Sequence, residues 1–183
     1  MTLNIGCLNL TKEILKSNSK YNFNTSIFEI HNECFPENNH VQQTHIDTII
    51  NMCTNQFSKL LINKDNKELI GYILILVGGR YTEDGYSSIA DEKYCILFNI
   101  GIKKEYQNKK IGFTYLKKVM DEIRFYNFNI QLIVREDNLR AQRVYKKLNF
   151  IQERVIENHF QNININGLVY TKIDFLTDYP IQI

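Results

Sequence analysis

A basic segment that contains a glycine, between a predicted strand and a predicted helix, is the part of this sequence best suited to chemistry. Residues 98–113 read FNIGIKKEYQNKKIGF, with an apolar run ending at Ile102 and a helix expected to begin near Lys109. A helix N-terminus exposes unpaired backbone N–H groups and about half a positive charge, which together bind anions. Gly112 removes a side chain where a phosphate would approach, and four lysines add charge: Lys103, Lys104, Lys109 and Lys110. The pattern predicts a phosphate site; the alternative is a surface turn with solvated lysines that leads into an ordinary amphipathic helix.

The cysteines offer less chemistry than the basic segment. Cys7, Cys34, Cys53 and Cys95 are far apart, and no two of them form a C-x-x-C pair. Zinc sites use closely spaced ligand pairs, so the sequence predicts no metal centre. Because no secretory signal is visible, the four cysteines favour buried reduced thiols over disulfides.

Composition places the chain among ordinary globular proteins. Its 183 residues and mass of 21.7 kDa fit a single domain over residues 1–183. Hydrophobic residues make up 44% and charged residues 23%, which excludes a disordered chain. A net charge of +2 gives no reason to expect a nucleic-acid partner. The longest apolar run, Leu69–Val77, has about half of the roughly 20 residues that a membrane span needs, so we expect a cytoplasmic protein with no membrane span.

Hydrophobic periodicity predicts the elements that must position the basic segment. In chain order they are a strand at 3–7, helices at 24–35 and 46–53, strands at 57–62, 68–77 and 94–102, a helix from 109, a strand at 130–134, a helix capped by Asp137 or Asn138, and strands at 151–156 and 168–175. Residues 78–91 are polar and contain glycine, so we expect a mobile surface loop there. The 94–102 segment is too continuously apolar for a surface strand, and Gly101 within it indicates a bulge or a close approach. This order predicts a mixed α/β sheet.

Two motifs then resemble those of one known family. Q-N-K-K-I-G at 107–112 resembles the R/Q-x-x-G-x-G/A acetyl-CoA loop of the GNAT acetyltransferases, and residues 138–150 resemble the N-x-x-A-x-x-x-Y-x-x-x-G-F segment of the same family. The resemblance covers residues 94–176 well. Within the family, Phe35-Pro36 and the G-L-V-Y strand at 167–170 look most like the protein N-terminal acetyltransferases. The resemblance to the GNAT family implies a single-domain GNAT fold: a mixed, mostly antiparallel central sheet flanked by helices, with a splayed cofactor-binding strand.

The resemblance also implies acetyl-CoA as cofactor and a role for each matching residue. The backbone from Asn108 to Phe113 would hold the pyrophosphate, and Ile100 to Ile102 would pair with the pantetheine arm as an added strand would. Tyr145 would place its hydroxyl near the thioester sulfur as a general acid, although its spacing is also that of a core residue. The implied cofactor-binding residues are Ile100, Gly101, Ile102, Gln107, Asn108, Lys109, Lys110, Ile111, Gly112, Phe113, Asn138 and Tyr145, and the implied substrate-binding residues are Phe35, Pro36, Phe98, His159 and Phe160.

The sequence departs from the family pattern at four positions. Lys110 and Asn149 stand where the pattern has glycine, and Asn is the next-best residue for a left-handed conformation. Ile96 and Ile133 align with the Tyr and the His that serve as bases in the N-terminal acetyltransferases. His159 is a possible substitute base; the alternative is a surface histidine after a strand.

The missing base bears on the acceptor. An α-amino group with a pKa of about 8 is roughly a tenth neutral at pH 7, whereas a lysine near 10.4 is below about 0.1% neutral. We therefore expect an acetyl-CoA-dependent N-acetyltransferase, with a peptide or protein N-terminus as the acceptor, by direct attack on a thioester polarised by amides of the central strand. Three alternatives are a small-molecule amine as acceptor, a catalytically weak or inactive CoA-binding subunit, and an enzyme that works with an auxiliary subunit.

Overall fold

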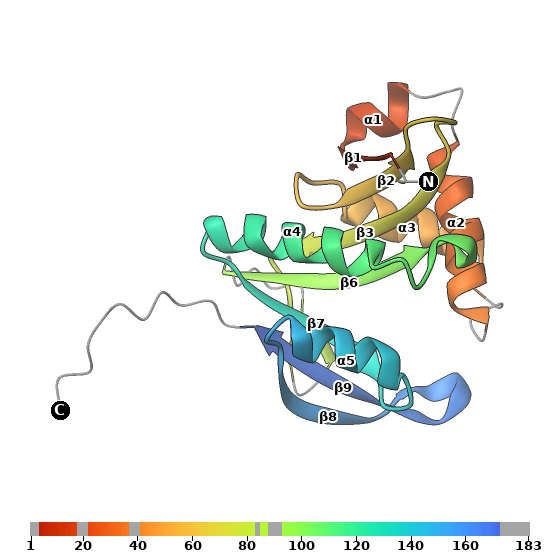
Figure 1. Cartoon of the computed structure of the whole chain (residues 1–183). Helices are drawn as coiled ribbons and strands as arrows, with labels where there is room; N and C mark the ends of the chain where they lie inside the picture. The colour runs from red at the N-terminus through yellow and green to blue at the C-terminus, as the bar shows by residue number, and fades with distance from the viewer. Residues whose placement is uncertain (1–3, 18–21, 37–40, 83–84, 88–92, 173–183) are drawn as a thin grey trace, which may run out of the picture. The chain divides into compact units, whose positions relative to one another are not determined.

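The computed structural model describes residues 4–17, 22–36, 41–82, 85–87 and 93–172 (Figure 1). By its internal contacts the chain divides into two compact units. The first contains Met1–Val77 and Ile96–Val119, and the second contains Gly78–Cys95 and Met120–Ile183. Each unit is described by itself.

The first unit is built on strands in the order β1 (Ile5–Asn9), β2 (Lys59–Asn63), β3 (Leu69–Val77) and β6 (Tyr94–Ile102). The β1–β2 and β2–β3 pairs are antiparallel, so β2 and β3 form a hairpin. At the end of β6, the Lys103 backbone N–H donates to the Ile70 carbonyl at 2.9 Å. Strands that are apolar on both faces must be covered on both faces, which explains the helices on either side.

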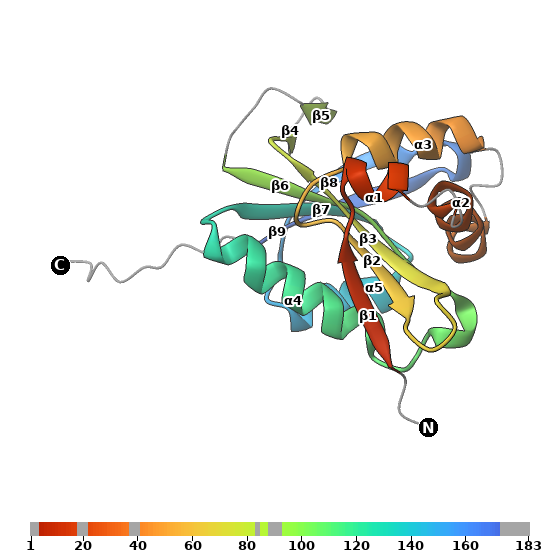
Figure 2. The same ribbon diagram turned by 90° about the horizontal axis from the view of Figure 1, so that it is seen from above.

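Helices cover both faces of these strands: α1 (Lys12–Ser17), α2 (Phe23–Cys34), α3 (Gln43–Met52) and α4 (Ile111–Phe125), with a 3₁₀ turn η2 (Lys104–Tyr106) before α4. Neighbouring residues of β6 face opposite ways. A methyl group on Gly101 would meet Ile30 of α2, whereas Gly112 of α4 faces the side chains of Ile100 and Ile102. Figure 2 accordingly shows α4 on one side of the strands and α3 on the other.

A β-bulge in β3 decides which face Tyr72 takes. The register with β2 shifts between Leu61 and Ile62, which leaves Ile70 as an extra residue. Ile70 packs with Leu61 on the α4 face, whereas the Tyr72 hydroxyl hydrogen-bonds His31 of α2. Without the extra residue, alternation along the strand would send Ile70 and Tyr72 to the same face.

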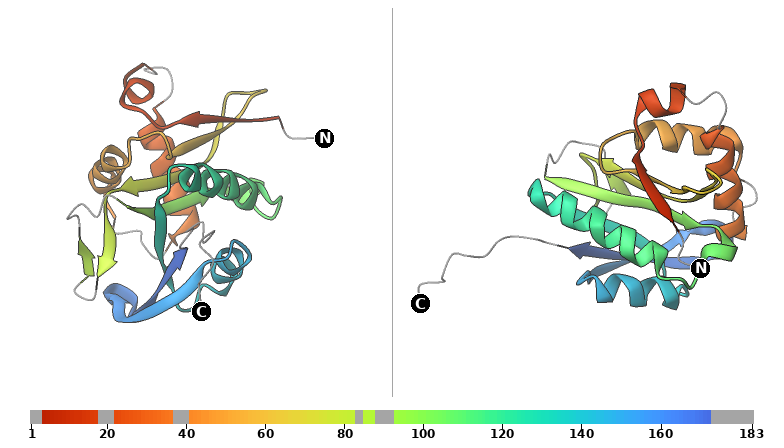
Figure 3. Two further views of the ribbon diagram at one scale, coloured as in Figure 1. Left: turned by 90° about the vertical axis from the view of Figure 1, so that its left-hand side faces the viewer. Right: turned by 45° about the horizontal axis from the view of Figure 1, so that its top comes forward.

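The second unit has three antiparallel strands in the order β7 (Asn129–Arg135), β9 (Ile165–Lys172) and β8 (Ile151–Phe160), with η3 (Gln161–Ile163) between β8 and β9. Helix α5 (Leu139–Lys147) lies beside them (Figure 3). The centre of its Tyr145 ring is 6.4 Å from that of the Tyr170 ring in β9. A separate hairpin joins β4 (Arg80–Thr82) and β5 (Gly85–Ser87).

The predicted mixed α/β class with mostly antiparallel strands is confirmed, and strand 94–102 has the predicted bounds. The prediction of a loop over 78–91 is wrong where β4 and β5 form; residues 83–84 and 88–91 of it lie outside the described residues. The β4 strand depends on distant partners, because the Tyr81 backbone N–H donates to the Gln131 side chain at 2.8 Å. Helix α1 was not predicted, since six residues are too few for a periodic signal.

The expectation of four buried thiols is also corrected. Cys53 and Cys95 are buried, but Cys34 is half-buried and Cys7 is exposed on the edge strand β1. An edge strand has only one neighbour, which leaves its side chains less covered. In the part of the chain that the structure describes, no helix is long and apolar enough to cross a membrane.

Candidate functional site

The loop between β6 and α4 has the backbone conformation of an anion site. Asn108 and Lys110 both have φ of 60°, in the left-handed region, while Lys109 between them does not. Such alternation turns successive N–H groups toward one concavity. The Lys110 carbonyl accepts the first helical hydrogen bond, from Thr114 at 2.9 Å, so the N–H groups of the following residues lie in the first turn of α4, where the helix offers them no acceptor. This geometry fits a pyrophosphate.

The left-handed φ of Lys110 falls at the position where the family motif has glycine. Glycine adopts this conformation at no steric cost, whereas a residue with a Cβ does so at a cost of roughly 1–2 kcal/mol. The Lys110 side chain is exposed. The lysine therefore keeps the backbone shape that the glycine of the pattern serves, at some cost in conformational energy. Asn149 has φ of 64°, as its position in the other motif requires.

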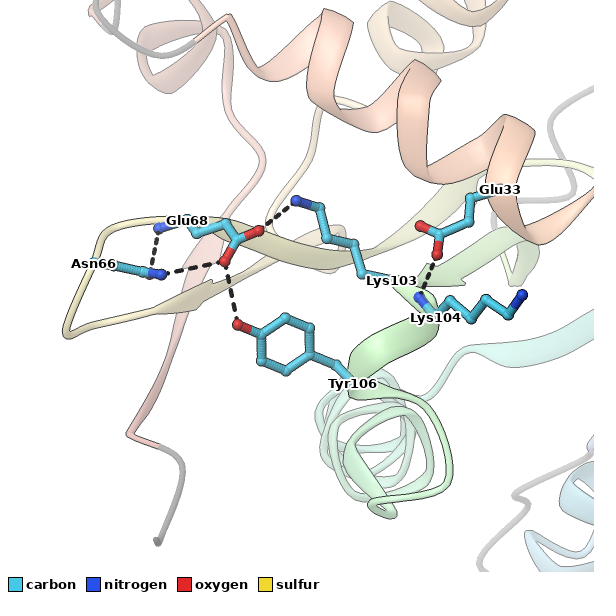
Figure 4. A network of polar contacts seen from close by, with 6 residues as sticks. All are labelled: Glu33, Asn66, Glu68, Lys103, Lys104 and Tyr106. Carbon is cyan, nitrogen blue, oxygen red and sulfur yellow. Dashed lines mark hydrogen bonds and ion pairs between the residues drawn. The ribbon is translucent and has the colours of Figure 1, made fainter.

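Lys103 does not add its charge to the anion site as the sequence suggests, because its ammonium pairs with Glu68 at 2.5 Å (Figure 4). The other oxygen of Glu68 accepts from the Tyr106 hydroxyl and from the Asn66 amide, each at 3.2 Å. The Lys103 hydrogen bond is the main reason that the pKa of Glu68 is lowered, and Glu68 in turn raises the pKa of Lys103. This network ties the β2–β3 turn to the start of the loop.

The other lysines of the basic segment are placed differently from one another. The backbone N–H of Lys104 donates to the Glu33 carboxylate at 2.8 Å. The Lys109 ammonium lies 5.3 Å from the centre of the Tyr106 ring, a cation–π contact. Glu37, the other carboxylate near the Phe35-Pro36 turn, lies outside the described residues.

Gln107 uses its side chain to close the loop. Its Nε2 donates to the Ile102 carbonyl at 2.9 Å, and the Cys34 thiol donates to the same oxygen at 3.3 Å. Since the Lys103 N–H bonds to β3, alternation along β6 directs the polar backbone groups of Ile100 and Ile102 to the opposite edge. That edge is where an added strand, or a pantetheine arm, would pair.

The predicted substrate residues of the first unit lie on two elements. Phe35 follows α2 directly and packs on His31, with 5.0 Å between the ring centres. Pro36 is exposed, and α2 ends at Cys34, as expected before an X-Pro pair. Phe98 is half-buried in β6.

In the second unit, Asn138 and Tyr145 belong to α5. Asn138 is the N-cap residue, and its Oδ1 accepts from the Ala141 N–H at 3.0 Å. Tyr145 is 8% exposed and packs edge-on against Phe150, and its hydroxyl makes no hydrogen bond to any described residue. Burial raises the pKa of Tyr145 to about 12. The ring is thus a core residue of the unit, while the hydroxyl keeps its proton.

His159 lies beside the position that the sequence left without a base. A methyl group built on Gly167 would come within 2.5 Å of the Ile133 side chain and 2.9 Å of the His159 Cβ. The two side chains therefore converge on one spot. Burial lowers the pKa of His159, so the imidazole is neutral at pH 7 and able to accept a proton. Its ring also meets the Phe160 ring edge-on at 4.9 Å.

Sequence reasoning missed Tyr81 as a neighbour of this histidine. Its ring centre is 6.3 Å from that of His159, at an interplanar angle of 90°. Tyr81 falls in the segment predicted to be a loop. The signal that was available is its large aromatic side chain in a polar stretch, flanked by Arg80 and Thr82, because such a residue is seldom left exposed.

Solved structures share this fold. PH1933 from Pyrococcus horikoshii OT3 matches with a TM-score of 0.70 at 17% identity, over 94% of this chain and 100% of that chain. The ribosomal-protein-S18-alanine N-acetyltransferase from Escherichia coli matches with a TM-score of 0.68 at 15% identity, over 96% and 98% of the two chains. Naa50 from Arabidopsis thaliana, in complex with the bisubstrate analogue CoA-Ac-MVNAL, matches with a TM-score of 0.64 at 20% identity, over 93% and 99%.

At these identities the likeness shows the fold, and a search of the curated proteins finds no match. The family itself is shown by the sequence: the model of the acetyltransferase (GNAT) family matches residues 24–150, more than half of the chain. The resemblance stated from the two motifs is confirmed, and the protein belongs to the GNAT acetyltransferase family.

Proposed function

We propose that this protein transfers the acetyl group of acetyl-CoA to an amine, and that the amine is the N-terminus of a peptide or protein. The observation that carries the proposal is the cradle of N–H groups formed by left-handed Asn108 and Lys110 at the start of α4. The Arabidopsis Naa50 structure, which holds an analogue that joins CoA to a peptide, supports this choice of donor and acceptor.

Bound acetyl-CoA would supply the activated thioester, and the residues of the chain would hold it. The backbone N–H groups of 108–113 bind the pyrophosphate, and the exposed ammonium of Lys110 adds attraction. The outward backbone groups of Ile100 and Ile102 pair with the pantetheine amides as a neighbouring strand would. The Ile102 carbonyl already accepts two hydrogen bonds, which leaves the Ile100 groups and the Ile102 N–H for this pairing.

Tyr145 acts on the departing thiolate as a hydrogen-bond donor. A thiol has a pKa of about 8.5, so full proton transfer from a phenol of pKa about 12 would be uphill by roughly 5 kcal/mol. A hydrogen bond to the developing negative charge on sulfur needs no such transfer. The proton that the thiol finally carries comes from the attacking amine, by way of a base.

His159 is the base in this proposal. Ile96 and Ile133 cannot accept a proton, whereas His159 has a neutral imidazole, and its Cβ lies against the same glycine as the Ile133 side chain. An N-terminal α-amine needs only modest help, because roughly a tenth of it is already neutral at pH 7. A lysine side chain would need far more, which favours N-termini over lysines.

A single domain over residues 1–183 and a cytoplasmic location belong to the same proposal. The family match from 24 to 150 runs through segments of both units, which supports one domain. The second candidate function is a CoA-binding subunit without catalysis, and the two isoleucines at the base positions favour it. With an auxiliary subunit, or with a small-molecule amine as acceptor, the molecule that this protein acts on or binds would differ. The proposed acetyl-CoA site would stay the same.

Two measurements test the proposal. The unfolding midpoint should rise with acetyl-CoA in a saturable way, since ligand at a hundred times its Kd stabilises the folded state by about 2.7 kcal/mol. A panel of peptides with free N-termini should then be assayed for acetylation. Each peptide is paired with a control in which the N-terminus is blocked and one internal lysine is present. Only the peptides with a free N-terminus should be acetylated. A shift without turnover on any peptide or small amine would support the CoA-binding subunit instead, and no shift at millimolar acetyl-CoA would end both.

A further inference from the structure

A chain of hydrogen bonds runs through the first unit from α2 to β6, and the proposed reaction does not yet use it. The Nδ1 atom of His31 lies 3.3 Å from the Tyr72 hydroxyl, which lies 3.0 Å from the Oδ1 atom of Asn99. Tyr72 is fully buried and His31 is 6% exposed. A polar chain buried this deeply costs desolvation unless each member is satisfied, so its presence calls for an explanation.

The direction of the chain follows from its chemistry. A carbonyl oxygen only accepts, so the single proton of Tyr72 is donated to Asn99. The Tyr72 oxygen must then accept from His31, which fixes the protonated nitrogen as Nδ1. Burial raises the pKa of Tyr72 well above its usual value, so the phenol keeps this proton. The chain therefore holds the Asn99 amide in one orientation.

That orientation leaves the amide nitrogen of Asn99 as a directed donor. Its oxygen is engaged by Tyr72, and no described residue accepts a hydrogen bond from its Nδ2. The side chain is half-buried, so the donor is partly shielded from water while remaining accessible. A fixed donor of this kind is suited to an oxygen atom of a ligand.

The position of Asn99 indicates which oxygen that is. In the proposed complex the pyrophosphate lies at 108–113 and the pantetheine runs back along β6 from Ile102 to Ile100. The thioester then comes next, beside Asn99, since each strand residue advances about 3.3 Å. Asn99 lies next to Tyr72, on the α2 face, where Phe35 also packs.

Resting on that proposed function, we infer that Asn99 donates its amide N–H to a carbonyl oxygen at the reacting centre, and that Tyr72 and His31 are positioning residues for it. The oxygen belongs either to the acetyl group or to the first peptide unit of the acceptor. The chemistry of recognition is the same in both cases, and kinetics separates them.

The test compares Asn99→Ala and Tyr72→Phe with the matched control Tyr115→Phe. Tyr115 also donates a hydroxyl hydrogen bond, to the Ile5 carbonyl at 3.2 Å, but it lies on the α4 face. We expect kcat/KM for a peptide to fall about 100-fold in Asn99→Ala and about tenfold in Tyr72→Phe, with little change in the control. In the double variant the Tyr72 change should cost nothing further, because it acts only through Asn99.

Whether the oxygen belongs to the acetyl group or to the acceptor can be read from how the loss of kcat/KM divides between kcat and KM. If it is the acetyl oxygen, calorimetry should show that the preference for acetyl-CoA over CoA disappears in both variants, and kcat should fall. If it is the acceptor's oxygen, binding of acetyl-CoA should be unchanged and the peptide KM should rise. Asn99→Ala alone carries the test if Tyr72→Phe does not fold, because Asn99 is not a core residue.

Two results would overturn the inference while leaving the proposed function intact. One is an active protein in which Asn99→Ala and Tyr72→Phe match the control within twofold. The other is an additive loss in the double variant, which would mean that Tyr72 does not act through Asn99. A wild-type protein that neither binds acetyl-CoA nor turns over would instead withdraw the proposed function, and this inference with it.

Discussion

His159 of β8 and Ile133 of β7 meet at Gly167 of β9, where a methyl group would come within 2.5 Å of Ile133 and 2.9 Å of His159. The central strand of the three carries no side chain at this point, so the two side chains on its neighbours fill the space. The Cβ of His159 is thereby brought close to Ile133, the residue predicted to stand at the position of a base. Gly167 is thus required by packing and by the proposed chemistry.

Gly167→Ala should lower the free energy of unfolding by about 1–3 kcal/mol, because a buried methyl group has no room there. Urea unfolding measures this. The control is Gly6→Ala, where the new methyl would come closest to the flexible Lys64 side chain, at 3.1 Å, and would be in ordinary contact with the Ile62 carbonyl at 3.7 Å; it should cost less than about 0.5 kcal/mol. Equal stabilities of the two variants would contradict the close packing at Gly167.

The pH profile of kcat/KM should reveal His159. Its pKa is lowered by burial, so the imidazole loses its proton below the usual 6.5 and serves as base above that point. The rate should therefore fall as the pH drops below about 6.5, in addition to the fall set by the α-amine of the substrate near pH 8. His159→Gln should lose the lower limb and keep the upper one. An unchanged profile would assign the base elsewhere.

Much of the fold could be predicted from the sequence, because long periodic segments specify their own type. The strand at 94–102 and the helix over 24–35 are examples, and both ends of the latter have local signals in Asn22 and Pro36. The β4–β5 hairpin could not be predicted, since three-residue strands carry no periodic signal. They depend on partners such as Gln131, which is far away in the sequence.

The site shows the same division. The motif pattern indicated a left-handed residue at Asn149, and the structure has it, whereas the left-handed φ of Asn108 and of Lys110 in the loop was not predicted. The pairing of Lys103 with Glu68 was beyond prediction, because it depends on how the β2–β3 turn meets the end of β6. The bulge at Ile70, which turns Tyr72 toward α2, likewise has no recognisable signal in the sequence.

Lys110→Gly should stabilise the protein by up to about 1 kcal/mol. Glycine relieves the left-handed strain of roughly 1–2 kcal/mol, and the greater freedom of the unfolded chain offsets part of the gain. Lys109→Gly is the matched control, because Lys109 is not left-handed; it should lose about 0.5–1 kcal/mol. If the backbone holds the pyrophosphate, acetyl-CoA affinity should change less than about threefold in Lys110→Gly. A tenfold loss would mean that the ammonium carries the binding.

Glu68→Gln should lower the free energy of unfolding at neutral pH but not at acidic pH. The pKa of Glu68 is lowered in the folded state by Lys103, so its stabilisation is present above the unfolded pKa of about 4.3 and is lost as the pH falls through the folded value. We expect a loss of up to about 1 kcal/mol at pH 7 that shrinks as the pH falls below the unfolded pKa, measured by urea unfolding. The exposed Glu157 supplies the control, and Glu157→Gln should change the free energy of unfolding at pH 7 by less than about 0.5 kcal/mol.

Tyr145→Phe should reduce kcat about 100-fold while leaving the Kd for acetyl-CoA within about twofold, because the hydroxyl meets charge that develops only as the thiolate departs. The ring stays in the core, so the unfolding midpoint should move little. Tyr170→Phe is the control: its hydroxyl is buried without an acceptor among the described residues, so removing it should keep activity and raise stability slightly. Steady-state assays on one peptide measure kcat, and calorimetry measures the Kd for acetyl-CoA. Full activity in Tyr145→Phe would show that Tyr145 serves only in packing. Another group would then have to donate the hydrogen bond to the thiolate.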